Sequence, residues 1–142
     1  MKTTFVKPED IKKKWYLIDA ENKVLGKVAA KAVEIIQGKT NVLYRPDKDC
    51  GDYIVISNAA KIKVTGRKLE QKEYFKHSLW VGNYKLTKLK DMLKKKPEDV
   101  IMLAIKGMLP KNHLGRKLLT KVRVYAGADI QQTAQKPEKI EL

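Results

Sequence analysis

The sequence predicts an α/β domain in which a mostly parallel β-sheet lies between layers of helices. Segments typical of strands alternate with segments typical of helices in the first half of the chain and again near its end. The chain has 142 residues, of which 43% are hydrophobic, so it can bury a real core. No internal repeat or Gly/Ser-rich linker divides it. One domain is therefore expected over residues 1–142, with an irregular N-terminal arm (1–13) and a polar, irregular C-terminal tail (128–142).

The first half of the chain contains the clearest elements. Residues 15–20, WYLIDA, are aromatic and aliphatic and stop at the turn ENK, which is typical of a strand. Residues 24–39 predict a helix, because their apolar residues share one face and most of their charged residues the opposite one. Gly38 lies where a C-terminal cap belongs. Residues 52–57, DYIVIS, are rich in β-branched residues and predict a strand covered on both faces.

The middle of the chain is more polar. Residues 61–66, KIKVTG, alternate charged and apolar side chains and end at a glycine, so they predict a further strand. Residues 73–77 are expected to continue as an extended segment. Residues 86–96, LTKLKDMLKKK, predict a short and very basic helix with Thr87 as its N-cap.

A second helix should follow from Pro97, because proline fits the first turn of a helix and the next two residues are acidic. Residues 100–109 are apolar nearly all round, which predicts a buried helix that ends before Pro110. Residues 114–121 predict one or two further helical turns. Residues 122–127, VRVYAG, then predict a strand that closes on a glycine.

Charge is the unusual property of this chain. It carries 31 lysines and arginines against 16 aspartates and glutamates, a formal net charge of +15. Because self-repulsion at this charge opposes folding, a polyanionic partner is expected. Nucleic acid is the leading candidate, and an anionic membrane surface is the second.

A membrane partner is the weaker alternative. The chain contains no run of about 18 apolar residues, the length needed to span a bilayer. The basic helix at 86–96 lacks a wide apolar face, and its Leu86, Leu89 and Leu93 are expected to pack on the domain. The first residues have no signal-peptide run, and a single cysteine allows no intrachain disulfide. A cytoplasmic or organelle-interior protein is therefore expected.

Two sets of residues are candidates for phosphate or metal binding. Residues 38–40, GKT, lack the earlier glycine of a phosphate-binding loop and follow their helix instead of preceding it. A helix cap is the better interpretation. Cys50, His77 and His113 are isolated from one another, so no metal site is expected, and Cys50 is interpreted as a small packing residue.

One acidic cluster keeps an enzymatic alternative open. Asp47, Asp49 and Asp52 precede a predicted strand and could in principle supply a carboxylate pair for acid–base chemistry. A turn is the preferred interpretation of this cluster. A nucleic-acid-processing enzyme would need Asp49 or Asp52 beside His113 in a closed pocket.

The basic residues are concentrated in runs. Residues 77–96 contain six lysines and one acid, and residues 100–128 contain six lysines or arginines and no acid. A third run surrounds residues 61–68. One run alone is usually a solvated face, but three runs together with the net charge favour nucleic acid. Four aromatic residues could either stack on unpaired RNA bases or belong to the core: Tyr74, Phe75, Trp80 and Tyr84.

Residues 106–127, KGMLPKNHLGRKLLTKVRVYAG, closely resemble the signature region of the bacterial ribosomal large-subunit protein thirteen family. Residues 12–39, 50–68 and 97–110 resemble other segments of that family in the same order. The resemblance implies a three-layer α/β/α single domain with a mainly parallel four-stranded sheet.

The resemblance also implies a function. It implies a structural constituent of the large ribosomal subunit that binds large-subunit rRNA, takes part in early subunit assembly and performs no catalysis. The implied partners are this rRNA and neighbouring ribosomal proteins, with no cofactor, membrane or small-molecule substrate, and the implied location is the cytoplasmic ribosome. An mRNA-binding translational regulator remains an alternative.

Matching positions imply which residues face RNA. Around the loop between Gly107 and Gly115, where glycine would allow close approach to a ligand, they are Lys106, Lys111, His113, Arg116 and Lys117. A second basic loop contributes Arg67, Lys68, Lys76 and His77. The set is completed by Arg45, Lys85 and Lys121. The chain departs from the family at residues 44–47, 77–85 and 130–137, where the family often has histidines, so a metal role for the tail is not expected.

Overall fold

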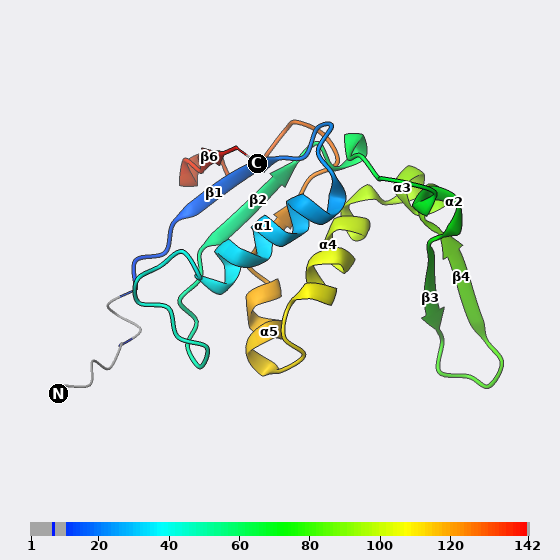
Figure 1. The fold of residues 1–142 in the computed structure, drawn as a ribbon, viewed down its shortest axis with the longest axis horizontal. Coiled ribbons are helices and arrows are strands. Elements are labelled where there is room, and N and C mark those ends of the chain that lie inside the picture. The colour runs from blue at the N-terminus through cyan, green and yellow to red at the C-terminus, as the bar shows by residue number, and fades with distance from the viewer. Residues whose placement is uncertain (1–6, 8–10, 142) are drawn as a thin grey trace.

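A four-stranded sheet forms the centre of the molecule (Figure 1), a computed structural model that describes residue 7 and residues 11–141. The strand order is β5-β2-β1-β6, and every neighbouring pair is parallel. The strands are β1 (Trp15–Asp19), β2 (Tyr53–Ser57), β5 (Val122–Val124) and β6 (Glu138–Ile140). The predicted α/β fold around a mainly parallel four-stranded sheet is thereby confirmed.

The core lies between the sheet and two long helices, α1 (Leu25–Gln37) and α4 (Pro97–Met108), which pack against each other (Figure 1). The apolar stripe of α1 faces inward because its buried residues recur at helical spacing. Ile18, Ile54 and Ile56 meet them from the strands and are fully buried. Each such side chain stabilises the fold by about 1.5–3 kcal/mol relative to exposure to water.

Gly38 ends α1 as predicted. Its φ is 74°, the left-handed conformation that glycine adopts without strain, and its N–H donates to the Ile35 carbonyl at 2.9 Å. A Cβ at this position would lie 2.5 Å from the Cys50 carbonyl oxygen, so the cap also fits closely against the next segment. Cys50 itself is buried, with its Sγ 3.4 Å from the Leu43 carbonyl oxygen, as expected of a packing residue.

Helix α4 begins at Pro97 and ends before Pro110, as predicted. It is not buried all round, however. Val100, Ile101 and Ile105 face the core, whereas Leu103 and Met108 are exposed. The sequence-based expectation of complete burial was wrong because only one side of α4 is covered by the rest of the fold.

Two predicted backbone assignments are corrected by the structure. Residues 61–66 do not form a strand, since only one isolated bridge joins Lys63 to Val24. The irregular tail expected at 128–142 instead supplies the edge strand β6, which pairs in parallel with β1, and a short 3-10 helix, η3 (Thr133–Gln135). Most of the arm at 1–13 lies outside the described residues.

A two-stranded antiparallel hairpin projects from the body (Figure 1). Its strands are β3 (Glu73–His77), which was predicted as extended, and β4 (Tyr84–Lys88), whose residues 86–88 were predicted as the start of a helix. Thr87 therefore lies within a strand and caps nothing. The helix α3 (Leu89–Lys95) begins after Lys88, without a side-chain cap. Leu89 is buried as expected, whereas Leu86 is exposed on the hairpin.

Two short helices complete the body. They are α2 (Lys68–Gln71), before the hairpin, and α5 (His113–Leu119), between α4 and β5, with a 3-10 turn, η2 (Ala59–Lys61), after β2. None of the helices in the described part of the chain has the length and apolar character needed to cross a bilayer.

Candidate nucleic-acid interface

Three grooves meet on the exposed side of α4. One runs between α4 and α5, the second between α4 and the β3–β4 hairpin, and the third between α4, the start of α1 and α2. Leu103, which is 39% exposed, lines all three. The grooves therefore form one continuous uneven surface, which we call the α4 surface.

The groove between α4 and α5 brings together three of the predicted RNA-facing residues. Lys106 comes from α4, Lys111 from the connecting loop and Arg116 from α5, and all three line it. No acidic side chain is among the described residues that line this groove. The planar guanidinium of Arg116 can bond two phosphate oxygens at once, whereas each lysine acts as a point charge.

The position of α5 follows from two local contacts. Asn112 is its N-cap, and its Oδ1 accepts a hydrogen bond from the Gly115 N–H at 2.8 Å. Gly115 packs so closely on the preceding loop that a Cβ there would lie 1.8 Å from the Pro110 carbonyl oxygen. The prediction that Gly115 leaves room for a ligand is thus corrected, because the chain itself occupies that space.

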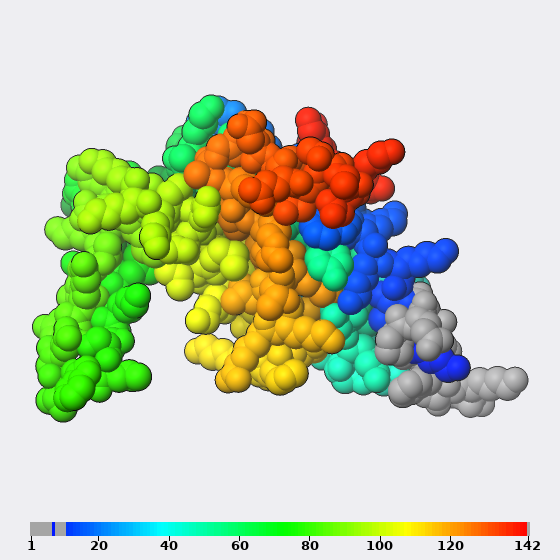
Figure 2. Space-filling view, turned by 180° about the vertical axis from the view of Figure 1, so that it is seen from behind, coloured from blue at the N-terminus to red at the C-terminus, as the bar shows by residue number. Residues whose placement is uncertain are grey.

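The groove between α4 and the hairpin has a volume of about 630 Å³. Figure 2 shows the corresponding hollow between the hairpin (green) and the α4–α5 region (yellow to orange). Lys76 from β3 and Lys106 from α4 line it together, although they are far apart in the sequence. Lys95 and Lys96 add two more cations from the end of α3, against the single acid Asp99 among the described lining residues.

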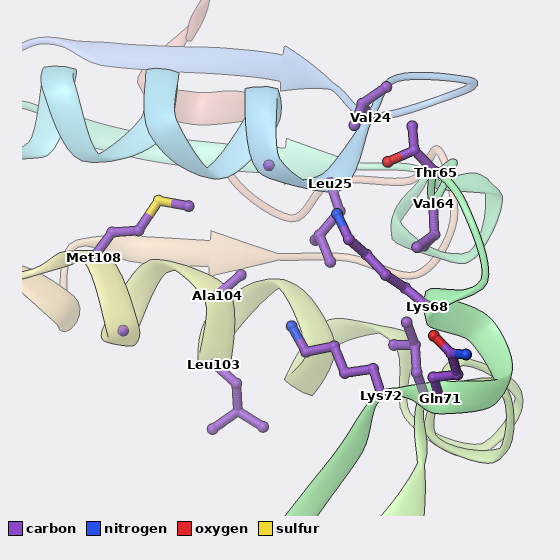
Figure 3. A pocket seen from close by; sticks show the side chains of 13 residues that line it. Val24, Leu25, Val64, Thr65, Lys68, Gln71, Lys72, Leu103, Ala104 and Met108 are labelled. Carbon is purple, nitrogen blue, oxygen red and sulfur yellow. The ribbon is translucent and has the colours of Figure 1, made fainter.

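The third groove receives the basic residues of α2 (Figure 3). Figure 3 shows the side chains of Lys68 and Lys72 reaching from this segment toward α1 and α4. Arg67 is the exposed residue just before α2, after the turn at Gly66, whose φ is 65°. Lys68 therefore brings the predicted second basic loop to the α4 surface. Arg67 directly precedes Lys68 in the chain.

Lys121 is not an RNA-facing residue, contrary to prediction. It is 4% exposed, and its ammonium donates to the Asp49 carboxylate and, at 2.7 Å, to the Gly51 carbonyl oxygen. Lys13 also donates to Asp49, at 3.1 Å. Lys121 therefore ties β5 to the segment before β2 instead of facing solvent.

The electrostatics of this pair reflect its burial. Burial lowers the pKa of Lys121, against the opposing effect of its hydrogen bond to Asp49. Burial acts to raise the pKa of Asp49, but the hydrogen bonds from Lys121 and Lys13 outweigh it, and the pKa is lowered. The geometry supports a charged lysine, because both carbonyl and carboxylate oxygens accept its protons and the Tyr53 ring lies 5.7 Å away.

The remaining candidates are outside the grooves or at their margins. Lys117 and His113 are exposed on α5, and Lys85 is exposed on β4 opposite Lys76. His77 is exposed at the end of β3, and its Nδ1 accepts the Leu79 N–H at 2.9 Å. Arg45 is half-buried and pairs with Asp47 at 3.1 Å. It lines a further pocket, which shares Pro110 and Asn112 with the groove between α4 and α5.

Sequence reasoning missed three groove cations, Lys72, Lys95 and Lys96. Lys95 and Lys96 belong to a charge run that the sequence displays, but the run does not reveal which of its members face the hairpin. Lys72 is isolated in the sequence by Gln71 and Glu73 and carries no such signal.

The acidic cluster is used for structure. The Asp52 carboxylate accepts the Lys14 backbone N–H at 2.8 Å, and Asp49 is held by Lys121 and Lys13. These contacts occupy the carboxylates that an acid–base site with His113 would require. Within residues 7 and 11–141, no group of three or more His, Cys, Asp and Glu side chains is arranged to hold a metal ion.

Comparison with known proteins gave consistent results. The sequence profile of the family described as "Ribosomal protein L13" matches residues 13–131. The "Large ribosomal subunit protein uL13" of Aquifex aeolicus (strain VF5) is 49% identical over 142 residues, covering 100% of this chain and 99% of that protein. Proteins with the same description are 51% identical in Lachnospira eligens (97% of each chain) and 48% identical in Thermotoga maritima (99% of this chain, 95% of that one).

Proposed function

The chain belongs to the ribosomal protein L13 family, and from this premise we propose that it is a structural constituent of the large ribosomal subunit that binds large-subunit rRNA through the α4 surface. The full-length similarity to proteins described as large-subunit components supports this role. Its partners are then rRNA and neighbouring ribosomal proteins, its place is the cytoplasmic ribosome, and its contribution is made early in subunit assembly. The proposal assigns it no catalytic step.

The observation that carries the proposal is the convergence of cations on the α4 surface. Seven lysines line the three grooves, and Arg116 adds a guanidinium as the eighth cation: the lysines are Lys68, Lys72, Lys76, Lys95, Lys96, Lys106 and Lys111. Asp99 is the one acid among the described residues that line the three grooves. These positive charges repel one another unless an anion lies against them. A phosphate backbone supplies closely spaced negative charges of the required kind.

The chemistry of this surface fits backbone recognition. Ammonium and guanidinium groups bond phosphate oxygens without distinguishing the bases, so they fix the position of the protein on a folded RNA. The three grooves separate the cations onto different walls, so that more than one RNA segment can be held at once. Sequence selectivity is then carried by the fold of the RNA and by its unpaired nucleotides.

The test is the salt dependence of binding to large-subunit rRNA. The logarithm of the binding constant should fall linearly with the logarithm of salt concentration, by about 0.7 to 0.9 per phosphate neutralised. Arg116→Ala should reduce that slope by about one phosphate contact, or by about 0.7 to 0.9. The matched control is Lys139→Gln, which removes an exposed charge from β6, away from the α4 surface.

Two results would count against this proposal. One is a binding constant that does not change between low and moderate salt. The other is an equal loss of affinity in the Arg116 and Lys139 variants, which would mean that only net charge matters.

In cell extract, the protein should sediment with large subunits and be released at high salt. Its presence in the soluble fraction at low salt would contradict the ribosomal role.

A further inference from the structure

The β3–β4 hairpin exposes an unusual amount of apolar surface. Six of its large hydrophobic residues are exposed: Phe75, Leu79, Trp80, Val81, Tyr84 and Leu86. Soluble proteins rarely leave apolar side chains contiguous on a projecting element, and such patches mark binding surfaces. The cations of the α4 surface do not account for these residues, so the hairpin needs a second kind of contact.

The register of the hairpin sorts its side chains onto two faces. Phe75 pairs with Leu86 and His77 pairs with Tyr84, which places them on one face, whereas Lys76 pairs with Lys85 on the other. The Phe75 ring lies 5.9 Å from the Tyr84 ring and 6.2 Å from the His77 ring, with interplanar angles of 23° and 19°. The first face is therefore lined by three nearly parallel rings, and we call it the ring face.

The opposite face indicates what kind of molecule lies against the hairpin. Lys76 and Lys85 stand directly across from each other, and like charges in this position destabilise a pair of strands. No acid occurs between residues 74 and 90, and Asp99 is the one acid among the described residues that line the groove with Lys76. An anionic partner removes this repulsion, and among anionic partners a nucleic acid also offers flat π surfaces to the rings.

We infer that the ring face of Phe75, His77 and Tyr84 stacks on unpaired RNA bases, while Lys76 and Lys85 hold neighbouring phosphates. This inference rests on the proposed function and names the part of the RNA that the hairpin recognises. Bases in a continuous duplex have both faces stacked on their neighbours, so only unpaired bases can present a free face to these rings. Phe75 is 66% exposed and Tyr84 is 59% exposed, so both side chains are accessible to an RNA.

The experiment compares two RNA probes with the same number of phosphates. One is a duplex interrupted by an internal loop of unpaired adenosines, and the other has that loop closed by complementary uridines. Affinities are measured by fluorescence anisotropy of labelled RNA. The wild-type protein should prefer the looped RNA, because the closed duplex offers phosphates but no free base.

Phe75→Leu and Tyr84→Leu keep an apolar side chain but remove a ring. Each should weaken binding to the looped RNA about tenfold, as expected for the loss of one base stack, and leave its salt slope unchanged. Binding to the closed duplex should stay as in wild type. Phe75→Tyr keeps a ring and should bind the looped RNA as tightly as the wild-type protein does.

The matched control on the same hairpin is Val81→Ala, since Val81 is fully exposed and aliphatic. It should not change the affinity for either RNA. Thermal melts of all variants should coincide with wild type, because the altered side chains are exposed. If the leucine variants melt early, the preference of the wild-type protein for the looped RNA over the closed duplex still tests the stacking inference.

Four outcomes separate this inference from the proposed function. Equal wild-type affinity for both RNAs, or leucine variants that bind the looped RNA normally, would overturn the stacking inference while salt-dependent RNA binding survives. An equal loss in Val81→Ala would overturn it too, because the loss would then follow exposed apolar area on the hairpin and not its rings. Failure to bind either RNA would instead remove the proposed function.

Discussion

Replacing Lys121 by alanine should lower the stability of the protein and leave its contacts with RNA intact. Lys121 lies in the acid-free basic segment together with Arg116, and the sequence alone does not separate the two. The structure does, because the Lys121 side chain is 4% exposed and donates to the Asp49 carboxylate and the Gly51 carbonyl oxygen. Arg116 is exposed and lines a groove.

The magnitude follows from what the substitution leaves behind. Removing one partner of a buried ion pair usually costs about 3–5 kcal/mol, because the other charge stays buried without compensation. Asp49 would keep Lys13 at 3.1 Å, whose side chain is 33% exposed. We therefore expect a loss near the lower limit, about 3 kcal/mol, which corresponds to a fall in Tm of about 10 °C for a chain of this size.

The assay is a thermal or urea melt of Lys121→Ala and Arg116→Ala, together with the salt dependence of rRNA binding below the melting range. Arg116→Ala should melt within about 0.5 kcal/mol of wild type but show a smaller salt slope. Lys121→Ala should show the reverse. The assignment of Lys121 to the core would be refuted if its variant melted like wild type and lost affinity as Arg116→Ala does.

Two further predictions concern stability. Gly115→Ala should cost about 1–3 kcal/mol in a urea melt and weaken RNA binding, because its Cβ would meet the Pro110 carbonyl oxygen at 1.8 Å and force α5 to move. Gly107→Ala, which meets no atom within 4 Å, is the control and should stabilise the protein by about 0.5–1 kcal/mol; equal effects would contradict the close packing of α5. The free energy of unfolding should also fall on acidification, because the folded pKa of Asp49 is lowered by its lysine partners against the effect of burial. The stabilising contribution of Asp49 is complete above the pKa of an unfolded aspartate and is lost as the pH falls through the folded pKa. Asp49→Asn should therefore flatten this part of the dependence of stability on pH, measured by urea melts. An unchanged pH profile would show that the lysines do not stabilise the Asp49 carboxylate.

The parts of the fold that could be predicted are those whose periodicity is set by burial. Strands β1 and β2 and helix α1 are covered by the core, so their apolar spacing matches their structure. Residues 61–66 alternate as a strand does, but alternation does not specify a partner, and only Lys63 finds one. Leu86 and Leu89 have helical spacing with Leu93, yet the chain changes from strand to helix between them. Residues 138–140 contain two charged residues and a single apolar one, Ile140, because an edge strand needs little apolar surface.

The positive charge of the candidate site could be predicted from the sequence, but not which residues form it. Runs of lysine indicated an anionic partner, and Lys106, Lys111 and Arg116 do share one groove. Lys121 was misassigned because its partner, Asp49, lies 72 residues away and sequence spacing carries no information on such a pair. The two-faced hairpin also escaped prediction, since the alternation of its side chains has meaning only once β4 is known to pair with β3.

The pairing of β1 with β6 has a consequence for synthesis of the protein. About 120 residues are added to the growing chain after β1 before Tyr16 can pair with Glu138. At usual translation rates of about 5–20 residues per second, this delay is on the order of 10 s. During that time one edge of a hydrophobic strand has no hydrogen-bonded neighbour and can pair with another nascent chain. A polypeptide interrupted before residue 138 would keep this edge open permanently, so aggregation and proteolysis, more than loss of core packing, should govern its fate in the cell.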